Sequence, residues 1–308
     1  MVDWTRGNKV LFTRQFLHSM TARIRDIEFQ PNCTRKFVTA GIQHLSFWIL
    51  NGNNLESQSG ELTIPRAFGQ QSTYAFSAKD EYHGRYGLSL VSKDGQVKEA
   101  VQTYKKNEVD KDLENLMVTF LNIGFLADNL ITSGDDGFLY LWEGQRIMRR
   151  IFAHEGAVLA LHCNSKLGLI VSGGMEGIVT LWRLNTELKS NVKSLERLKI
   201  YNMRRGVSDA KLAVKDPECN VQSLCLGLNR IVIGMRTGSI YEVMISEDQK
   251  IIKPHHDAQN DPVKRWLKGL DHEVPLHVGT DNTTSRIFTM TKQGLFTVWD
   301  MVNFDIVY

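Results

Sequence analysis

The sequence of 308 residues lacks the features of a secreted, membrane-spanning or disulfide-stabilised protein. Its four cysteines, Cys33, Cys163, Cys219 and Cys225, are scattered without a CxxC pair, which predicts reduced thiols and argues against the ligand spacing of a zinc site. No apolar run approaches the roughly 18 to 20 residues of a membrane-spanning helix. The polar first residues also lack the apolar core of a signal peptide. We therefore expect a cytoplasmic protein that does not contact a membrane.

Motifs of catalysis and cofactor binding are also missing. The chain has no GxxxxGK[ST] loop, no GxGxxG opening a helix, no GxSxG turn and no HExxH helix. The cluster His255-His256-Asp257 lies in a polar stretch where adjacent side chains point apart, which favours a solvated loop over a metal site. The pair Asp135-Asp136 fits a tight turn. These absences predict a protein that is not an enzyme and that holds no cofactor or metal.

Strong charge of one sign is lacking as well. The formal net charge is +3 and the pI is about 8.6. This mild excess favours an acidic protein surface as partner and falls far short of what nucleic-acid binding requires. We expect protein partners and no nucleic acid.

The sequence does contain an internal repeat of β-hairpins. Each copy has a strand rich in β-branched residues, a tight turn with Gly or a polar pair, and a second strand ending in Trp; the copies span 36–48, 130–142, 169–182 and 286–300. A fifth copy, 230–243, keeps the hairpin without the Trp. An alternating apolar run precedes each hairpin, and candidate fourth strands such as 146–151 follow. Three or four strands per repeated unit predict an all-β propeller with five recognisable blades across residues 1–308.

Two segments leave the count and closure of the blades open. Residues 63–112 amount to about one extra unit of chain. We interpret them as an insertion between blades, and a sixth, degenerate blade is the alternative. Residues 9–15 are a candidate fourth strand for the final blade, which would close the ring by joining the two ends of the chain.

The hairpins resemble WD repeats, which share a His before the first strand, a Ser or Thr on the second, an Asp in the turn and a Trp on the third. The resemblance implies a hydrogen-bonded chain that is incomplete in every unit here. We interpret the matching side chains as buried structural groups and not as catalysts. They are His154, Ser172, Glu176 (in place of Asp) and Trp182 in the third unit, Ser133, Asp136 and Trp142 in the second, His18, Thr39 and Trp48 in the first, and Trp299 in the last.

A narrower resemblance lies in the order of particular phrases. The runs 26–31 (DIEFQP), 44–53 (HLSFWILNGN) and 153–158 (AHEGAV), followed by the Trp-less hairpin, are similar to the EMAP-like (echinoderm microtubule-associated protein-like) family of WD-repeat proteins. The resemblance implies the later blades of the first propeller in a larger tandem unit. It also implies a cytoskeletal scaffold that binds tubulin or microtubules. The alternative is a general adaptor for ubiquitin-ligase or signalling complexes.

Basic clusters are the candidate partner-binding residues. If several share one rim they would meet the acidic tails of tubulin, whereas ordinary solvated surface is the alternative for any one cluster. The candidates are Arg23, Arg25, Arg149, Arg150, Arg204, Arg205, Lys264 and Arg265.

Overall fold

The computed structural model describes most of the repeat region. The described residues are 2–3, 9–10, 23–52, 54–65, 90–91, 97–98, 113–187, 192–204, 209–227, 229–245, 263–268, 273–281, 286–300 and 305–307. His18, Arg205 and the side chains of Lys264 and Arg265 lie outside this part.

Five antiparallel sheets, which we number blade 1 to blade 5, account for the predicted repeats. In each, the strands follow one another in chain order, as a meander of hairpins requires. Blade 1 contains β3 (Ile24–Phe29), β4 (Lys36–Gly41), β5 (His44–Asn51) and β6 (Asn54–Ser59). Blade 2 contains β11 (Phe120–Leu126), β12 (Asn129–Gly134), β13 (Phe138–Glu143) and β14 (Arg146–Phe152). Blade 3 contains β15 (Val158–Asn164), β16 (Leu169–Gly174), β17 (Ile178–Glu187) and β18 (Val192–Asn202).

Blades 4 and 5 continue the same plan. Blade 4 contains β19 (Val221–Leu226), β20 (Arg230–Met235), β21 (Ser239–Met244) and β22 (Val263–Lys268). Blade 5 contains β23 (Pro275–Asp281), β24 (Arg286–Thr291) and β25 (Phe296–Asp300). Between blades 3 and 4 lie helix α2 (Ala210–Lys215) and the short helix η3 (Pro217–Cys219), capped by the side chains of Asp209 and Asp216.

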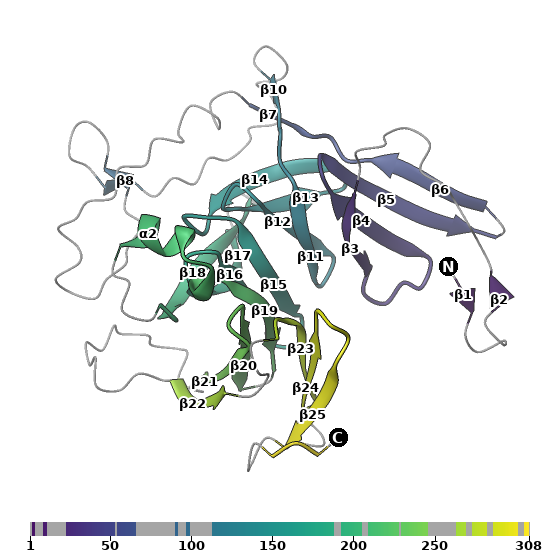
Figure 1. Cartoon of the computed structure of the whole chain (residues 1–308). Helices are drawn as coiled ribbons and strands as arrows, with labels where there is room; N and C mark the ends of the chain where they lie inside the picture. Colours follow the sequence, from purple (N-terminus) through teal and green to yellow (C-terminus); the bar gives the residue numbers. More distant parts are fainter. Residues whose placement is uncertain are drawn as a thin grey trace.

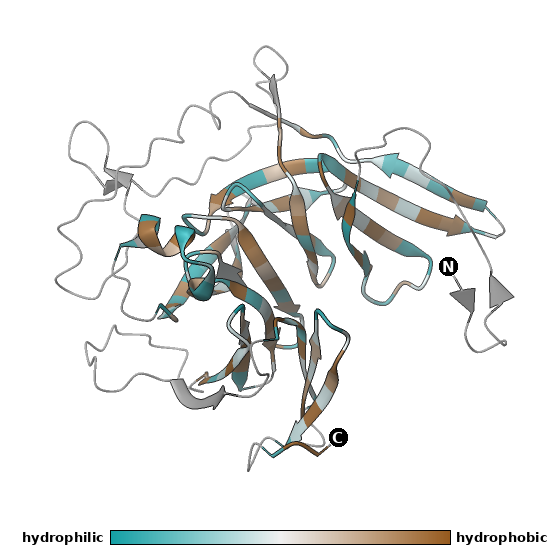
Figure 2. Cartoon of the chain, viewed as in Figure 1, coloured by the Kyte–Doolittle hydropathy of each residue, from teal (hydrophilic) through white to brown (hydrophobic). Residues whose placement is uncertain are grey.

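The sheets are arranged around an arc whose two ends are blade 1 and blade 5 (Figure 1). The first strands of successive blades contact one another, β3 with β11, β11 with β15, β15 with β19 and β19 with β23. Apolar residues concentrate on the blade strands (Figure 2), and the buried clusters lie between neighbouring sheets. The prediction of an all-β propeller with five recognisable blades is therefore confirmed.

Short strand pairs lie outside the blades. They are β1 (Val2–Asp3) with β2 (Lys9–Val10), β7 (Thr63–Pro65) with β10 (Leu113–Asn115), and β8 (Leu90–Val91) with β9 (Val97–Lys98). β11 contacts both β3 and β4, so blades 1 and 2 are direct neighbours. Most of 66–112 lies outside the described residues, and its assignment as an insertion stays a prediction.

The described part of the chain does not show the predicted closure of the ring by residues 9–15. Lys9 and Val10 pair with Asp3 and Val2, and residues 11–15 lie outside the described part. The free edge of β25 is used by the end of the chain instead, because Ile306 bridges Trp299. Val307 N–H also donates to the carbonyl oxygen of Val298 at 2.8 Å. The fourth-strand position of blade 5 therefore belongs to residues 305–307.

Candidate functional site

A tryptophan indole hydrogen-bonded to a hydroxyl recurs at one position of the blades. The donor is Nε1 of Trp48, Trp142, Trp182 and Trp299, and the acceptor is the hydroxyl of Thr39, Thr132, Ser172 and Thr289, at 2.8 to 3.0 Å. Each indole is at most 4% exposed, so its N–H needs a partner inside the protein. The hydroxyl strand and the tryptophan strand are paired neighbours, which places the two groups on one face.

In blade 3 this pair extends into a buried chain of four residues. Nε2 of His154 lies 2.8 Å from Oγ of Ser172, and Nδ1 of His154 lies 2.7 Å from Oε1 of Glu176. The indole of Trp182 is only a donor, so the Ser172 oxygen accepts from it and also forms a hydrogen bond with His154. The Glu176 side chain reaches the position expected for Asp. The expectation that the network is incomplete in this unit is therefore wrong.

This chain has the distances of a Ser-His-acid catalytic arrangement, yet burial removes it from any substrate. Ser172 is 0% exposed and His154 is 1% exposed. A nucleophilic hydroxyl must reach a reacting atom, and here it is held between an indole and an imidazole inside an interface between sheets. The arrangement ties blade 3 together and is not a candidate active site.

In blade 1 the Thr39 hydroxyl contacts a histidine that the sequence pattern did not single out. His18 lies outside the described residues, whereas Nε2 of His44 lies 2.9 Å from the Thr39 hydroxyl that also accepts from Trp48. His44 begins β5, directly after the turn at Ile42 and Gln43. Half-burial lowers the pKa of His44. The tight turn between β4 and β5 brings this ring onto the hydroxyl, which a rule based on a preceding histidine does not anticipate.

Blade 2 corrects the assignment of Ser133. The hydroxyl paired with Trp142 is that of Thr132, while Oγ of Ser133 accepts from Nδ2 of Asn122 at 2.9 Å. The signal was available in the sequence, because the hydroxyl in blades 3 and 5 also lies ten residues before its tryptophan. A one-residue shift along a strand moves a side chain to the opposite face.

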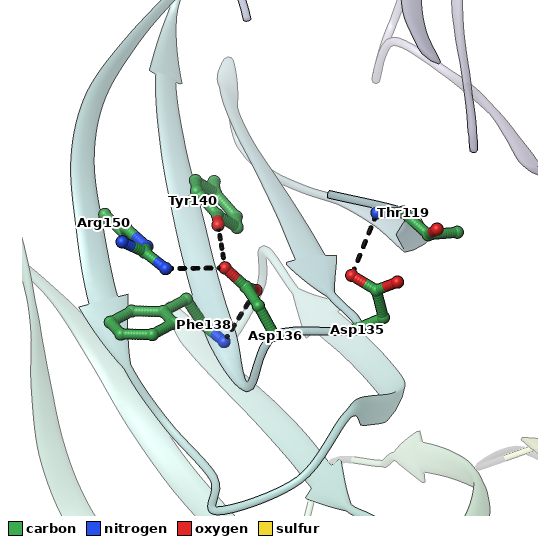
Figure 3. A network of polar contacts seen from close by, with 6 residues as sticks. All are labelled: Thr119, Asp135, Asp136, Phe138, Tyr140 and Arg150. Atoms are coloured by element: carbon green, nitrogen blue, oxygen red, sulfur yellow. Dashed lines mark hydrogen bonds and ion pairs between the residues drawn. The ribbon is translucent and has the colours of Figure 1, made fainter. Parts of the chain in front are cut away.

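The turn of blade 2 holds a separate polar network (Figure 3). Oδ2 of Asp136 accepts from the Tyr140 hydroxyl at 2.5 Å and from Arg150 at 2.8 Å. The Arg150 guanidinium also lies 3.7 Å from the centroid of the Phe138 ring. Burial, followed by the charge of Asp136, raises the pKa of Tyr140. The neighbouring Asp135 accepts from the backbone N–H of Thr119. Asp136 thus secures the hairpin through Tyr140 and Arg150, without a histidine.

Blade 4 loses the indole and the hydroxyl together. By register, Val243 occupies the tryptophan position opposite Ile231, and Ile233 occupies the hydroxyl position. Both are 0% exposed. Replacing both partners of a buried hydrogen bond by apolar groups leaves no unsatisfied donor, which is why the Trp-less unit still forms a blade.

Several of the candidate basic residues are not on an open rim. Arg149 is 3% exposed, and Arg150 is held by Asp136 with its side chain 13% exposed. Arg204 is half-buried, close to Gly177. Arg23 and Arg25 are exposed. The proposal that Arg149 and Arg150 present free charge to a partner is therefore wrong, because both serve the packing of blade 2.

The described residues contain no group of three His, Cys, Asp or Glu side chains placed to hold a metal ion. No helix in this part of the chain has the length and apolar character needed to cross a bilayer.

The Thr132 assignment gives a first test. Thr132→Val keeps the shape of the side chain and removes the acceptor of the buried Trp142 N–H, so we expect it to lower the free energy of unfolding by about 1–3 kcal/mol. Ser133→Ala is the matched comparison, since it leaves the indole pair intact. Urea unfolding measures both. A loss of stability in Ser133→Ala with none in Thr132→Val would contradict the assignment.

Comparison with known proteins agrees with this architecture. No protein-family model matches the chain. The chain is 26% identical over 184 residues to "Echinoderm microtubule-associated protein-like 2" of Rattus norvegicus, and equally so to the Mus musculus protein of that name. The match covers 58% of this chain and 20% of each relative, so the chain matches about a fifth of their length.

Solved structures show the fold. The WD40 β-propeller domain of Doa1 superimposes with a TM-score of 0.54 at 11% identity, covering 93% of this chain and 68% of that one. The propeller domain of Cps50 (Swd1) from Myceliophteria thermophila gives a TM-score of 0.58 at 9% identity, covering 91% and 70%. By its fold and its sequence similarity, the chain is a WD-repeat β-propeller protein similar to the EMAP-like group.

Proposed function

We propose that the chain is a non-catalytic, protein-binding scaffold whose partner is tubulin or the microtubule. The observation that carries the proposal is the similarity over 184 residues to relatives named as microtubule-associated proteins. Because this similarity covers a fifth of those relatives, the activity of the whole relative is carried over as a proposal only.

The chemistry of the described blades supports a scaffold. Their side-chain networks are buried and serve packing, as in the chain from Trp182 to Glu176. Exposed cations at Arg23 and Arg25 and a net charge of +3 favour an acidic partner.

Sedimentation with polymerised microtubules tests the proposal. We expect the chain to pellet with microtubules at low salt and progressively less as salt rises, because screening shortens the reach of exposed charges to about 10 Å at 0.1 M. Microtubules stripped of their acidic tails by proteolysis are the control and should retain less of the chain. Absence of pelleting at low salt would contradict the microtubule assignment and favour a general adaptor.

A further inference from the structure

The first strand of each inner blade presents three side chains to the preceding blade. Strand register identifies them. On the second strand of the same blade, the residues opposite them include the one at the hydroxyl position and the one that pairs with the tryptophan position. They are Phe120, Ile123 and Phe125 in blade 2, Val158, Leu161 and Cys163 in blade 3, and Val221, Leu224 and Leu226 in blade 4. All nine are buried or half-buried, and most lie in the apolar clusters between sheets.

The same three positions in blade 1 are apolar and exposed. Ile24, Ile27 and Phe29 lie opposite Gly41, Thr39 and Phe37, and they are 40%, 55% and 47% exposed. Phe29 packs on Phe37 with ring centroids 5.5 Å apart, and Phe37 stacks on Trp48 at 5.8 Å. We name this surface, Ile24, Ile27 and Phe29 together with the basic residues described next, the leading face of blade 1. Blade 1 stands at one end of the arc of blades in Figure 1.

Three arginines flank this apolar strip at its two ends. Arg23 and Arg25 lie at the start of β3, and Arg35 lies in the hairpin that leads into β4. All three are exposed, and within the described residues none of them forms an ion pair. Backbone hydrogen bonds fix both ends, from Ile42 N–H to the Arg23 carbonyl and from Gln30 N–H to the Lys36 carbonyl.

The acidic residues of β3 are on the opposite face. Asp26 and Glu28 lie opposite Ala40 and Val38, which face blade 2. Oδ2 of Asp26 accepts from the backbone N–H of Ile123 in blade 2 at 2.7 Å. The leading face therefore combines an apolar centre with positive ends over one strand of six residues, which spans roughly 20 Å.

We propose that the leading face of blade 1 docks an extended acidic segment of a partner protein, with apolar side chains at its centre and Glu or Asp at its ends. The apolar centre of the docked segment covers Ile24, Ile27 and Phe29. The preceding sheet covers the equivalent positions of blades 2 to 4 in the same way. Its acidic ends pair with the flanking cations. The inference rests on the proposed scaffold function and names the surface and chemistry of the partner.

A second copy of the chain is a poorer occupant of this face. The exposed apolar residues at the other end of the arc include Met290, Leu295 and Phe296, and the loop between them carries Lys292 and no acidic residue. Contact between that surface and the leading face would bring cations together. Like charges placed across an interface oppose association.

A labelled peptide tests the proposal with the full chain. The probe is a fluorescein-labelled peptide of about ten residues, long enough to span β3, with Glu at both ends and alternating Val and Phe at its centre. Binding is followed by fluorescence anisotropy. The same peptide with Lys in place of every Glu is the control, and we expect it not to bind.

Charge reversals identify the surface. Arg25→Glu and Arg35→Glu should each raise the Kd by about three- to tenfold, the range that loss and reversal of an exposed ion pair gives. Arg236→Glu changes an exposed arginine of blade 4 and should leave the Kd unchanged. Phe29→Asn should weaken binding, and its thermal unfolding curve checks that the chain remains folded at the temperature of the assay, since the ring also packs on Phe37.

Several results would overturn the inference. They are equal Kd values for the Arg25→Glu, Arg35→Glu and unchanged chains, equal binding of the Lys peptide, or a dimer that Phe29→Asn dissociates. Peptide binding without microtubule pelleting would contradict the microtubule proposal and support the docking surface. Pelleting with microtubules that neither charge reversal changes would support the microtubule proposal and contradict the docking surface.

Discussion

Replacing His154 with Ala is expected to lower the free energy of unfolding by about 3–5 kcal/mol, since it removes one partner of a buried pair and leaves Glu176 without its hydrogen-bond donor. Glu176 is 2% exposed and its Oε1 lies 2.7 Å from the imidazole. The Ser172 hydroxyl loses its hydrogen bond to the imidazole in the same change. The stabilisation comes from satisfying groups that the fold has already taken out of water.

His277→Ala is the matched control for this variant. His277 lies in β23 and is exposed, so the same substitution should change the free energy of unfolding by no more than about 0.5 kcal/mol. Urea unfolding followed by tryptophan fluorescence measures both. If His154→Ala costs no more than the control, the buried chain from Trp182 to Glu176 does not stabilise blade 3.

Gly137→Ala is expected to cost about 2–5 kcal/mol, because two penalties fall on one residue. Its φ is +86°, a conformation that side chains with a Cβ avoid. A Cβ there would also lie 2.3 Å from the carbonyl oxygen of His154. The Gly137 carbonyl accepts from the N–H groups of Ala153 and His154, so the turn of blade 2 is fastened to the segment that positions the blade 3 histidine.

Gly144 separates the two penalties. It has a φ of +58°, and a Cβ added there meets nothing within 4 Å. Gly144→Ala should therefore cost only the backbone strain, about 1–2 kcal/mol. Thermal unfolding of the two variants gives the difference. Equal losses of unfolding free energy would mean that the close approach of the blade 2 turn to His154 adds no cost to the substitution.

The residues of the tryptophan position and of the turns could be read from the sequence. The recurrence of hairpins ending in Trp48, Trp142, Trp182 and Trp299 predicted sheets at the correct places. The Trp-less repeat was predicted as a blade because apolar alternation alone specifies a buried strand. These features are local, since a period of two and a turn residue act within one hairpin.

The candidate site residues were only partly predictable. Glu176 stands in place of the Asp of the pattern, yet its longer side chain still reaches His154. The pattern named Ser133 where Thr132 is the acceptor of the indole, and it did not indicate the contact of His44 with Thr39. Such assignments depend on strand register and on turn length, which decide the face a side chain occupies.

The sequence by itself determined the repeat, the strands and the apolar faces, because alternation and turn chemistry are properties of short segments. Only the tertiary structure decided which charges are free. Arg149 is buried in the packing of blade 2, and Arg150 is paired with Asp136. Arg23 and Arg25, by contrast, are exposed beside the exposed side chains of Ile27 and Phe29. Charged side chains look alike in a sequence, and their availability depends on which sheets come together around them.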